Sequence, residues 1–266
     1  FMLIRNHTEY EVLYERLRQF GSLAVAFSGG VDSTFLLKAA SDAIPGRVLA
    51  LTVSAPYIPK WEIMEAAELA SSMQVPHYIV QASTLPALAV NPPERCYICK
   101  KALFGLLIDE AKKRGFQDIA DGTNADDAFD YRPGRKALNE LNVHSPLLEA
   151  GLGKKEIRKL SAILGLPTAD KPAYACLLTR IPYNTPVTDD ILGRIEEAEK
   201  QLHKFGFRDV RVRHHGDIAR IEVPEKSIPS LIASPDMGEI ITHLKHLGYR
   251  YVTLDLEGYR RSEPPK

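Results

Sequence analysis

The first half of the chain alternates short apolar runs with segments in which apolar residues recur at helical spacing. The apolar runs that predict buried strands cover residues 23–27, 47–53 and 77–80. The segments that predict amphipathic helices cover residues 32–41, 61–73, 100–114 and 154–164. Repeated strand–helix units of this length indicate an α/β fold, in which helices cover both faces of a parallel sheet.

The pattern changes after a proline-rich stretch, residues 167–186, that shows little periodicity. A stretch of this length without regular structure more often serves a function than a mere connection. The helices and strands predicted beyond it cover residues 188–204, 210–213, 218–223, 240–247 and 251–256. We therefore predict an N-terminal α/β domain over residues 1–185 and a small C-terminal α+β domain over residues 186–266.

Composition and charge exclude several classes of protein. Lysine and arginine number 34, as do aspartate and glutamate, so the formal net charge is zero and a globally basic nucleic-acid binder is disfavoured. No apolar run approaches the roughly 20 residues that a membrane-spanning helix needs, and the first residues turn polar too soon for a signal peptide. Three cysteines are too few, and odd in number, for a disulfide framework. We expect a cytoplasmic protein whose thiols serve another purpose.

A phosphate-binding loop is predicted where the first strand meets its helix, in the sequence SGGVDST. Two glycines allow a sharp turn and a close approach of the backbone to a ligand, and the following helix directs free N–H groups to the same place. Hydroxyl groups add donors that suit a phosphate. Asp32 would repel a phosphate unless Mg²⁺ lies between them, which favours a metal–nucleotide ligand over a bare anion. The alternative is a serine-rich helix cap with a pair of turn glycines. The candidate residues are Ser28, Gly29, Gly30, Asp32, Ser33 and Thr34.

This loop resembles the SGGxDS loop of the ATP-pyrophosphatase superfamily, which includes GMP synthetases, NAD synthetases and tRNA thiolases. Two other nucleotide loops, GxxxxGK[ST] and GxGxxG, are absent after this strand. The resemblance implies that ATP is cleaved between its α and β phosphates, that a substrate oxygen is adenylated and that pyrophosphate leaves. It also implies that adenine binds near the end of the second strand, at residues 51–54, where Ser54 is a candidate.

The three cysteines leave several kinds of site open. Cys96 and Cys99 form a CxxC pair, and Cys176 lies in the proline-rich stretch. A structural zinc site would need a fourth ligand from a histidine, and a dithiol redox pair would leave Cys176 unexplained. An iron–sulfur cluster held by three thiolates would leave one iron open to a substrate or sulfide. Buried cysteines without any ligand are the plainest alternative.

Motifs that span nearly the whole chain resemble the LarE family. They are residues 95–101 (RCYICKK), 121–127 (DGTNADD), 130–137 (DYRPGRKA), 176 with 179–183 (TRIPY), and 210–213 (VRVR) with 217–222 (DIARIE). The resemblance implies an ATP-dependent sulfur transferase in the biosynthesis of the nickel-pincer nucleotide, the cofactor of lactate racemase. Its substrate would be pyridinium-3,5-biscarboxylic acid mononucleotide, of which a carboxylate is adenylated and then converted to a thiocarboxylate.

The resemblance also implies two alternatives for the source of sulfur. Family members with only the cysteine that matches Cys176 give up that sulfur and are left with dehydroalanine. Members with a CxxC as well hold a [4Fe–4S] cluster on three cysteines and transfer a sulfide bound to it. This chain has all three, Cys96, Cys99 and Cys176, which favours the cluster. Thr179 stands where serine is common in the family, and it keeps the hydroxyl.

Basic residues are candidates for binding the substrate. Arg211 and Arg213 alternate on one face of a predicted strand, and with Arg180 they could hold phosphate and carboxylate groups. The alternative is a solvated strand face. The resemblance favours an anion site near a subunit interface, and hence a homo-oligomer, with Glu199 nearby. Arg132, with Arg135, could close over the nucleotide. His214 and His215 are interpreted as exposed loop residues without a role.

Three other functions remain open. A tRNA thiolase of the same superfamily shares the phosphate loop and the cysteines, but the neutral charge and the absence of an RNA-binding module argue against it. A nucleotide sensor with a structural zinc would show no pyrophosphate release. An amidotransferase resembling GMP or NAD synthetase would normally need a glutaminase segment, which the sequence lacks, although ammonia could serve directly.

Overall fold

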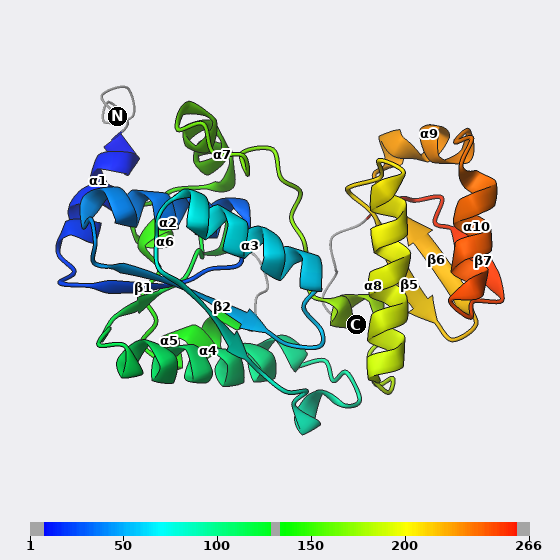
Figure 1. Cartoon of the computed structure of the whole chain (residues 1–266), viewed down its shortest axis with the longest axis horizontal. Coiled ribbons are helices and arrows are strands. Elements are labelled where there is room, and N and C mark those ends of the chain that lie inside the picture. Colours follow the sequence, from blue (N-terminus) through cyan, green and yellow to red (C-terminus); the bar gives the residue numbers. More distant parts are fainter. Residues whose placement is uncertain (1–7, 129–133, 260–266) are drawn as a thin grey trace. The chain divides into compact units, whose positions relative to one another are not determined.

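A computed structural model describes residues 8–128 and 134–259, which form two compact units (Figure 1). The first unit contains residues 8–83 and 96–174, and the second contains residues 84–95 and 175–259, within those described ranges. The predicted boundary at 185/186 leaves 84–95 and 175–185 on the N-terminal side, whereas in the structure both segments pack with the C-terminal residues.

The sheet of the first unit has four parallel strands in the order β3-β2-β1-β4. These are β1 (Leu23–Ala26), β2 (Val48–Ser54), β3 (His77–Gln81) and β4 (Ile119–Ala120). In β1, Val25 pairs with Ala50 on one side and with Ala120 on the other. The parallel sheet confirms the α/β prediction, and β4 adds a strand that the pattern left as the approach to a loop.

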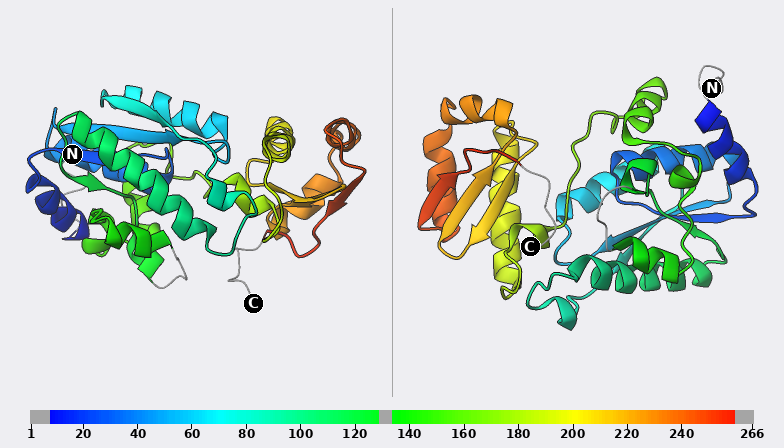
Figure 2. Two further views of the ribbon diagram at one scale, coloured as in Figure 1. Left: turned by 90° about the horizontal axis from the view of Figure 1, so that it is seen from below. Right: turned by 180° about the vertical axis from the view of Figure 1, so that it is seen from behind.

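Helices cover both faces of this sheet, as predicted. They are α1 (Thr8–Arg18), α2 (Val31–Ala43), α3 (Lys60–Ser72), α4 (Arg95–Lys113), α5 (Gly134–Glu140), α6 (Pro146–Glu149) and α7 (Lys154–Ile163), with a 3₁₀ turn η2 (Ala125–Ala128). The front and rear views place α1, α2 and α3 on one face and α4 and α5 on the other (Figures 1 and 2). The main apolar core joins the sheet to residues of α1, α2 and α7.

Two helical features differ from the sequence prediction. Helix α1 was not predicted, although Tyr10, Leu13, Tyr14 and Leu17 recur at helical spacing and are buried. Helix α4 begins at Arg95, five residues before the predicted start at residue 100. Its backbone turns directly after two prolines, where the Arg95 N–H donates to the Pro92 carbonyl at 3.0 Å. The CxxC pair therefore lies in the first turns of a helix.

The second unit is a three-stranded sheet with helices packed on one face (Figure 2). Its elements are η1 (Pro86–Leu88), η3 (Leu177–Arg180), α8 (Asp189–Lys204), β5 (Arg211–His215), β6 (Ile218–Glu222), η4 (Glu225–Ser227), α9 (Ile228–Ile232), α10 (Met237–His246) and β7 (Tyr251–Leu254). Strand β6 lies in the centre, antiparallel to β5 and parallel to β7. The predicted α+β unit is confirmed, and Thr188, the first residue of the predicted helix, caps α8: its side chain accepts a hydrogen bond from the Ile191 N–H at 3.2 Å.

A buried asparagine holds the turn η3 against residues 84–95. Asn91 is fully buried, and its amide donates to the carbonyls of Leu178, Ile181 and Pro182 at 3.1, 2.8 and 3.1 Å. The Arg95 guanidinium donates to Asn91 Oδ1 at 3.3 Å and stacks 4.2 Å from the Tyr183 ring centre. These contacts fix the backbone that carries Thr179 and Arg180. Within residues 8–128 and 134–259, no helix is both long enough and apolar enough to cross a membrane.

Candidate active site

A cavity of about 310 Å³ opens at the carboxyl ends of the strands in the first unit. Its lining comes from the ends of β1 and β2, from the loop after β4, and from α3 and α4. The chain leaves β1 toward one face of the sheet and β4 toward the other. The cavity therefore lies where the strand order reverses. Open α/β sheets bind their ligands at such a point. The topology therefore places a ligand site where the sequence predicted the phosphate loop.

The phosphate loop is held in shape by its own hydroxyl groups. Ser28 Oγ lies 3.1 Å from Ser33 Oγ, and it accepts the Gly30 N–H at 3.4 Å. Ser33 Oγ also donates to the Gly30 carbonyl at 3.2 Å. Of the predicted nucleotide-binding residues, Ser28, Gly30, Asp32 and Ser33 line the cavity.

Three predicted residues do not line the cavity. The Thr34 side chain is fully buried in α2, and Ser54 pairs with Gln81 at the end of β2. The neighbouring residues 51–53 line the cavity in place of Ser54. Gly29 acts through its backbone: its φ is +67°, and a Cβ would lie 3.1 Å from Ala66 Cα and Cβ in α3. Only glycine satisfies both conditions without strain.

Asp32 is one of the carboxylates that line this cavity. Lys154 Nζ, from the start of α7, donates to Asp32 Oδ2 at 2.5 Å. The other oxygen, Oδ1, is buried and has no well-formed hydrogen bond among the described residues. Burial raises the pKa of Asp32 above its ordinary value of 3.8; the Lys154 charge opposes this rise, and the nearby Asp127 carboxylate adds to it. An oxygen in this position suits a metal ion.

The loop after β4 brings further carboxylates to the cavity. Asp121 accepts hydrogen bonds from Thr123 Oγ1 at 2.5 Å and Ser145 Oγ at 2.7 Å, and Lys100 Nζ lies 3.8 Å from it. Asp127 is buried and accepts the Asn124 N–H at 3.2 Å. The sequence motif DGTNADD marked this loop only through the family resemblance. In the structure it packs against the phosphate loop: a Cβ at Gly122 would lie 3.0 Å from the Ser33 backbone nitrogen.

Arg158 of α7 and Lys171 of the proline-rich stretch connect that stretch to α7 and to the phosphate loop. Arg158 donates to the carbonyls of Ala169 and Lys171 at 2.5 and 2.7 Å. Lys171 Nζ in turn donates to the Gly29 carbonyl at 2.9 Å and to Glu65 Oε2 at 2.7 Å. No local pattern marked Lys154 or Lys171 as site residues, because the groups to which they donate lie more than 100 positions away in the chain.

The cysteines belong to different units. Cys96 is exposed and Cys99 is half-buried. They lie three positions apart on α4, and hence on one side of that helix, whereas the sequence predicted the helix only from residue 100. Cys176 is half-buried and directly precedes η3 in the second unit. Within the described ranges, no three His, Cys, Asp or Glu side chains form a group that could hold a metal ion. A cluster bound by these cysteines therefore stays a prediction.

A second cavity, of about 180 Å³, lies within the C-terminal unit. Its lining residues are Arg95, Thr179, Arg180, Ile181, Pro182, Tyr183, Arg213, His215 and Arg220. Two of the four predicted substrate-binding arginines, Arg180 and Arg213, are among them, whereas Arg211 is not and Arg132 lies outside the described residues. Arg95 and Arg220 were not predicted as site residues.

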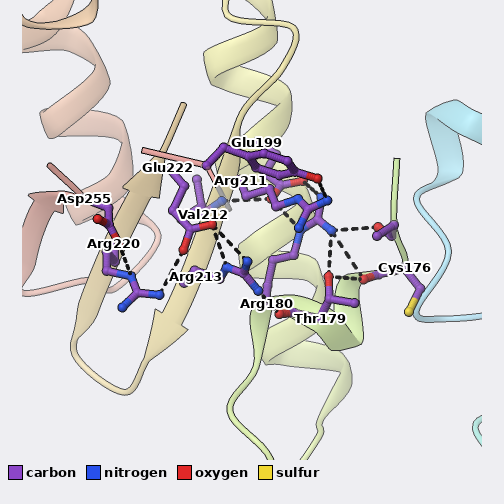
Figure 3. A network of polar contacts seen from close by, with 12 residues as sticks. Cys176, Thr179, Arg180, Glu199, Arg211, Val212, Arg213, Arg220, Glu222 and Asp255 are labelled. Carbon is purple, nitrogen blue, oxygen red and sulfur yellow. Dashed lines mark hydrogen bonds and ion pairs between the residues drawn. The ribbon is translucent and has the colours of Figure 1, made fainter. Parts of the chain in front are cut away.

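Buried carboxylates hold the arginines of this cavity (Figure 3). Arg180 binds both oxygens of Glu199, at 2.8 and 2.9 Å, and Glu199 also accepts the Val212 N–H at 2.8 Å. Arg213 and Arg220 share Glu222, each with a contact of 2.9 Å. The alternative of a solvated strand face is therefore wrong, because these side chains form an ordered network (Figure 3).

The same network reaches the residue next to Cys176. Arg180 Nη1 donates to the Ala175 carbonyl at 2.8 Å and to Thr179 Oγ1 at 2.9 Å, and Thr179 Oγ1 donates to the Cys176 carbonyl at 2.9 Å (Figure 3). The hydroxyl that Thr179 retains in place of serine is thus used. The backbone of Cys176 is positioned by the network that also carries the arginine cavity.

Arg211 and the two histidines complete this region. Arg211 is buried beside the Tyr259 ring, and burial, together with Arg180 and Arg213, lowers its pKa to about 9, so it stays charged at neutral pH. His214 is buried against Tyr249, and His215 is exposed and lines the cavity. Both lie in strand β5, so their interpretation as loop residues is wrong.

One predicted site residue cannot be placed. Arg132 lies outside the described residues. Its proposed companion Arg135 is described, at the start of α5, and Nη1 donates to the Asp127 carbonyl at 3.3 Å. Arg135 therefore contacts the loop after β4 at the edge of the nucleotide cavity.

Comparison with known proteins places this chain among several relatives. It is 38% identical over 260 residues to the pyridinium-3,5-bisthiocarboxylic acid mononucleotide synthase of Lactiplantibacillus plantarum, covering 95% of this chain and 92% of that protein. It is 40% identical over 252 residues to an uncharacterized protein, slr1717, of Synechocystis sp., covering 92% and 94%. A tRNA-specific 2-thiouridylase of Leptospira biflexa is 24% identical over 196 residues, covering 59% and 52%. No family model matches the chain.

Proposed function

Because the chain belongs to the LarE family, that of the Lactiplantibacillus plantarum synthase, we propose that it is an ATP-dependent sulfur transferase acting on pyridinium-3,5-biscarboxylic acid mononucleotide. The observation that carries this proposal is the identity of 38% over 95% of the chain to a synthase of the bisthiocarboxylic acid product. The nucleotide cavity at the switch point of the sheet supports it, because activation of a carboxylate requires ATP to bind there.

The cavity of the first unit fits a metal–nucleotide ligand. Ser28 and Ser33 hydroxyls and the N–H groups at the start of α2 would bind the pyrophosphate portion of ATP. Asp32 and Asp127 would hold Mg²⁺, and the Asp32 oxygen without a well-formed hydrogen bond fits this role. Bound Mg²⁺ supplies positive charge between these carboxylates and the phosphates. Lys100 and Lys171 add cations around the loop.

The proposed reaction has two steps. A substrate carboxylate oxygen forms a bond to the α-phosphorus of ATP, the bond between the α-phosphorus and the bridging oxygen breaks, and pyrophosphate leaves. A sulfur nucleophile then forms a bond to the carbonyl carbon, and AMP leaves with the carboxylate oxygen. AMP is a good leaving group, whereas the oxygen of a free carboxylate is not.

The arginine cavity of the second unit suits the phosphate and carboxylates of the mononucleotide. Arg95, Arg180, Arg213 and Arg220 line it. Three carboxylates, Glu199, Glu222 and Asp255, pair with the last three of these arginines. Four arginines against three carboxylates leave an excess of positive charge, to which the buried Arg211 adds. Because the guanidinium groups are held in place, they can bind an anion without losing further side-chain freedom.

We propose Cys96, Cys99 and Cys176 as the ligands of a [4Fe–4S] cluster. Three thiols are the ligand chemistry of such a cluster, and Cys96 and Cys99 lie one turn apart on α4. When bound, the cluster supplies an open iron that can carry sulfide. The alternative source of sulfur is Cys176 itself. A homo-oligomer, and the cytoplasm as the compartment that keeps thiols reduced, stay part of this proposal.

The proposed function is tested by measuring pyrophosphate release from ATP and Mg²⁺ with the mononucleotide, and by mass spectrometry of the product. We expect release that depends on the mononucleotide and a product in which sulfur replaces one carboxylate oxygen. Bulk tRNA at moderate salt serves as the competing substrate, and we expect neither release nor a gel shift with it. Firm tRNA binding with release would contradict the proposal and favour a tRNA thiolase.

The binding of an anion in the arginine cavity is expected to tighten as pH falls. His215 is exposed at the surface but partly desolvated, and this partial desolvation, with Arg220 and Arg213, lowers its pKa below the ordinary value of 6.5, so the ring is neutral at neutral pH. A bound anion favours the protonated ring. As pH falls, His215 therefore becomes protonated and adds a positive charge beside the anion, which raises the affinity. We expect affinity for sulfate, which does not titrate here, to rise about fivefold between about pH 7.5 and about pH 5.5.

Calorimetric titration of sulfate into the wild type and His215→Gln checks this expectation. The variant should bind sulfate with little pH dependence. His246→Gln, on the exposed surface of α10, is the matched control and should behave as the wild type. An equal pH dependence in His215→Gln would show that another group controls the binding.

A further inference from the structure

The ion pair between Lys154 and Asp32 joins a residue that lines the nucleotide cavity to the start of another helix. Asp32 lies in the first turn of α2, after the phosphate loop, and Lys154 begins α7, 122 positions later. The side chains are 20% and 30% exposed, so solvent reaches both groups. Lys154 Nζ therefore occupies a position beside the carboxylate that the proposed function assigns to Mg²⁺.

We propose that the Lys154 ammonium group prevents divalent metal ions from binding to Asp32 until ATP binds. In the free protein its ammonium group neutralises Asp32 and repels a metal ion. When ATP binds, its phosphates offer Nζ a stronger anionic partner, and Asp32 becomes available to the metal that accompanies them. This inference rests on the proposed nucleotide site, and it concerns the order in which metal and nucleotide bind.

The backbone of Lys154 is anchored, so its side chain can move alone. The Lys154 N–H donates to Asp126 Oδ2 at 2.7 Å. A Cβ added at the preceding Gly153 would lie 3.0 Å from Asp126 Oδ1, so the start of α7 packs directly against this carboxylate. Nζ can therefore leave Asp32 while the helix keeps its position. A long, flexible lysine side chain suits such a movement.

The charges around Asp32 explain why a cation at this position would prevent early metal binding. Asp32 and Asp127 lie close enough for the Asp127 carboxylate to raise the pKa of Asp32, and both line the cavity. Two neighbouring carboxylates would otherwise attract a divalent ion from solution. An ammonium group about 4 Å from a divalent ion repels it at an energy that exceeds thermal energy even in water. A polyphosphate binds both the Lys154 ammonium group and the metal ion, and its negative charge offsets their repulsion.

The test measures Mn²⁺ binding to the free protein by electron paramagnetic resonance, without nucleotide. The wild type is expected to bind Mn²⁺ weakly, and Lys154→Met about tenfold more tightly. Lys154→Arg keeps the charge and should bind as weakly as the wild type. Lys155→Met, on the exposed side of the same helix turn, is the matched control and should leave the affinity unchanged.

A double variant identifies the carboxylate. Lys154→Met combined with Asp32→Asn should lose the tenfold gain. Equal Mn²⁺ affinity in Lys154→Met and the wild type would overturn the inference, as would a gain that survives Asp32→Asn. The readout does not depend on turnover: a gain in Mn²⁺ affinity in a protein that fails to release pyrophosphate with the mononucleotide would reject the proposed substrate and keep the role of Lys154.

Discussion

Asp32→Asn is expected to lower mononucleotide-dependent pyrophosphate release by about 10³-fold. Asparagine keeps the size of the side chain but removes the charge that would hold Mg²⁺ against the phosphates. Asp32 lines the nucleotide cavity, and one of its oxygens is buried without a well-formed hydrogen bond among the described residues. The initial rate of pyrophosphate release, measured at saturating ATP, checks the prediction.

The loss should be separable from unfolding. The pKa of Asp32 is raised in the folded protein, so any stability linked to this group is present at low pH and is lost as pH rises through that raised value. At neutral pH the ionised carboxylate therefore contributes no stability through its charge, and we expect Asp32→Asn to melt no lower than the wild type. Asp42→Asn, in the same helix and paired with Lys38 at 2.6 Å, is the matched control and should keep its rate. A rate unchanged by Asp32→Asn would exclude the metal role.

Local patterns predicted the elements that carry the nucleotide site. The apolar run before the glycines predicted β1, and the helical spacing after them predicted α2, so the position of the phosphate loop followed directly. The predicted cavity residues Ser28, Gly30, Asp32 and Ser33 line the cavity. Ser54 does not: it is the last residue of β2, one position beyond residues 51–53, which line the cavity.

Contacts between distant segments could not be predicted in the same way. Lys154 meets Asp32, and Arg180 meets Glu199, only after the chain has folded, and neither pair shows in spacing. The alternation of Arg211 and Arg213 predicted a shared strand face, but it did not show that Glu222 and Glu199 would make that face an ordered network. Glutamates of this kind look like solvent-exposed charges in a sequence, and only burial distinguishes them.

Substitution of any one of the three cysteines by alanine is expected to remove the proposed cluster and multiple-turnover sulfur transfer. A cluster held by three thiolates loses a ligand in each variant. Cys96 and Cys99 lie one helical turn apart and would each bind a different iron, so neither thiolate can replace the other. Iron and acid-labile sulfide, with the visible absorption spectrum, should be measured on protein purified without oxygen. We expect about four of each per wild-type chain and a brown colour, both lost in Cys96→Ala, Cys99→Ala and Cys176→Ala.

Adenylation should survive these substitutions, because the nucleotide cavity contains no cysteine. A single round of pyrophosphate release in Cys96→Ala would therefore separate loss of sulfur transfer from loss of fold. Tyr97→Phe is the matched control between the two cysteines: it removes the hydroxyl that donates to Glu140 at 2.8 Å and should keep the iron.

The opposite result would identify the second source of sulfur. If the wild type stays colourless and free of iron after reconstitution, and only Cys176→Ala loses sulfur transfer, the cluster is rejected. Cys176 would then give its own sulfur, and the mass of the chain should fall by that of H₂S after one turnover. The network from Glu199 through Arg180 and Thr179 to the Cys176 backbone would, in that case, position the donor itself rather than a ligand of the cluster.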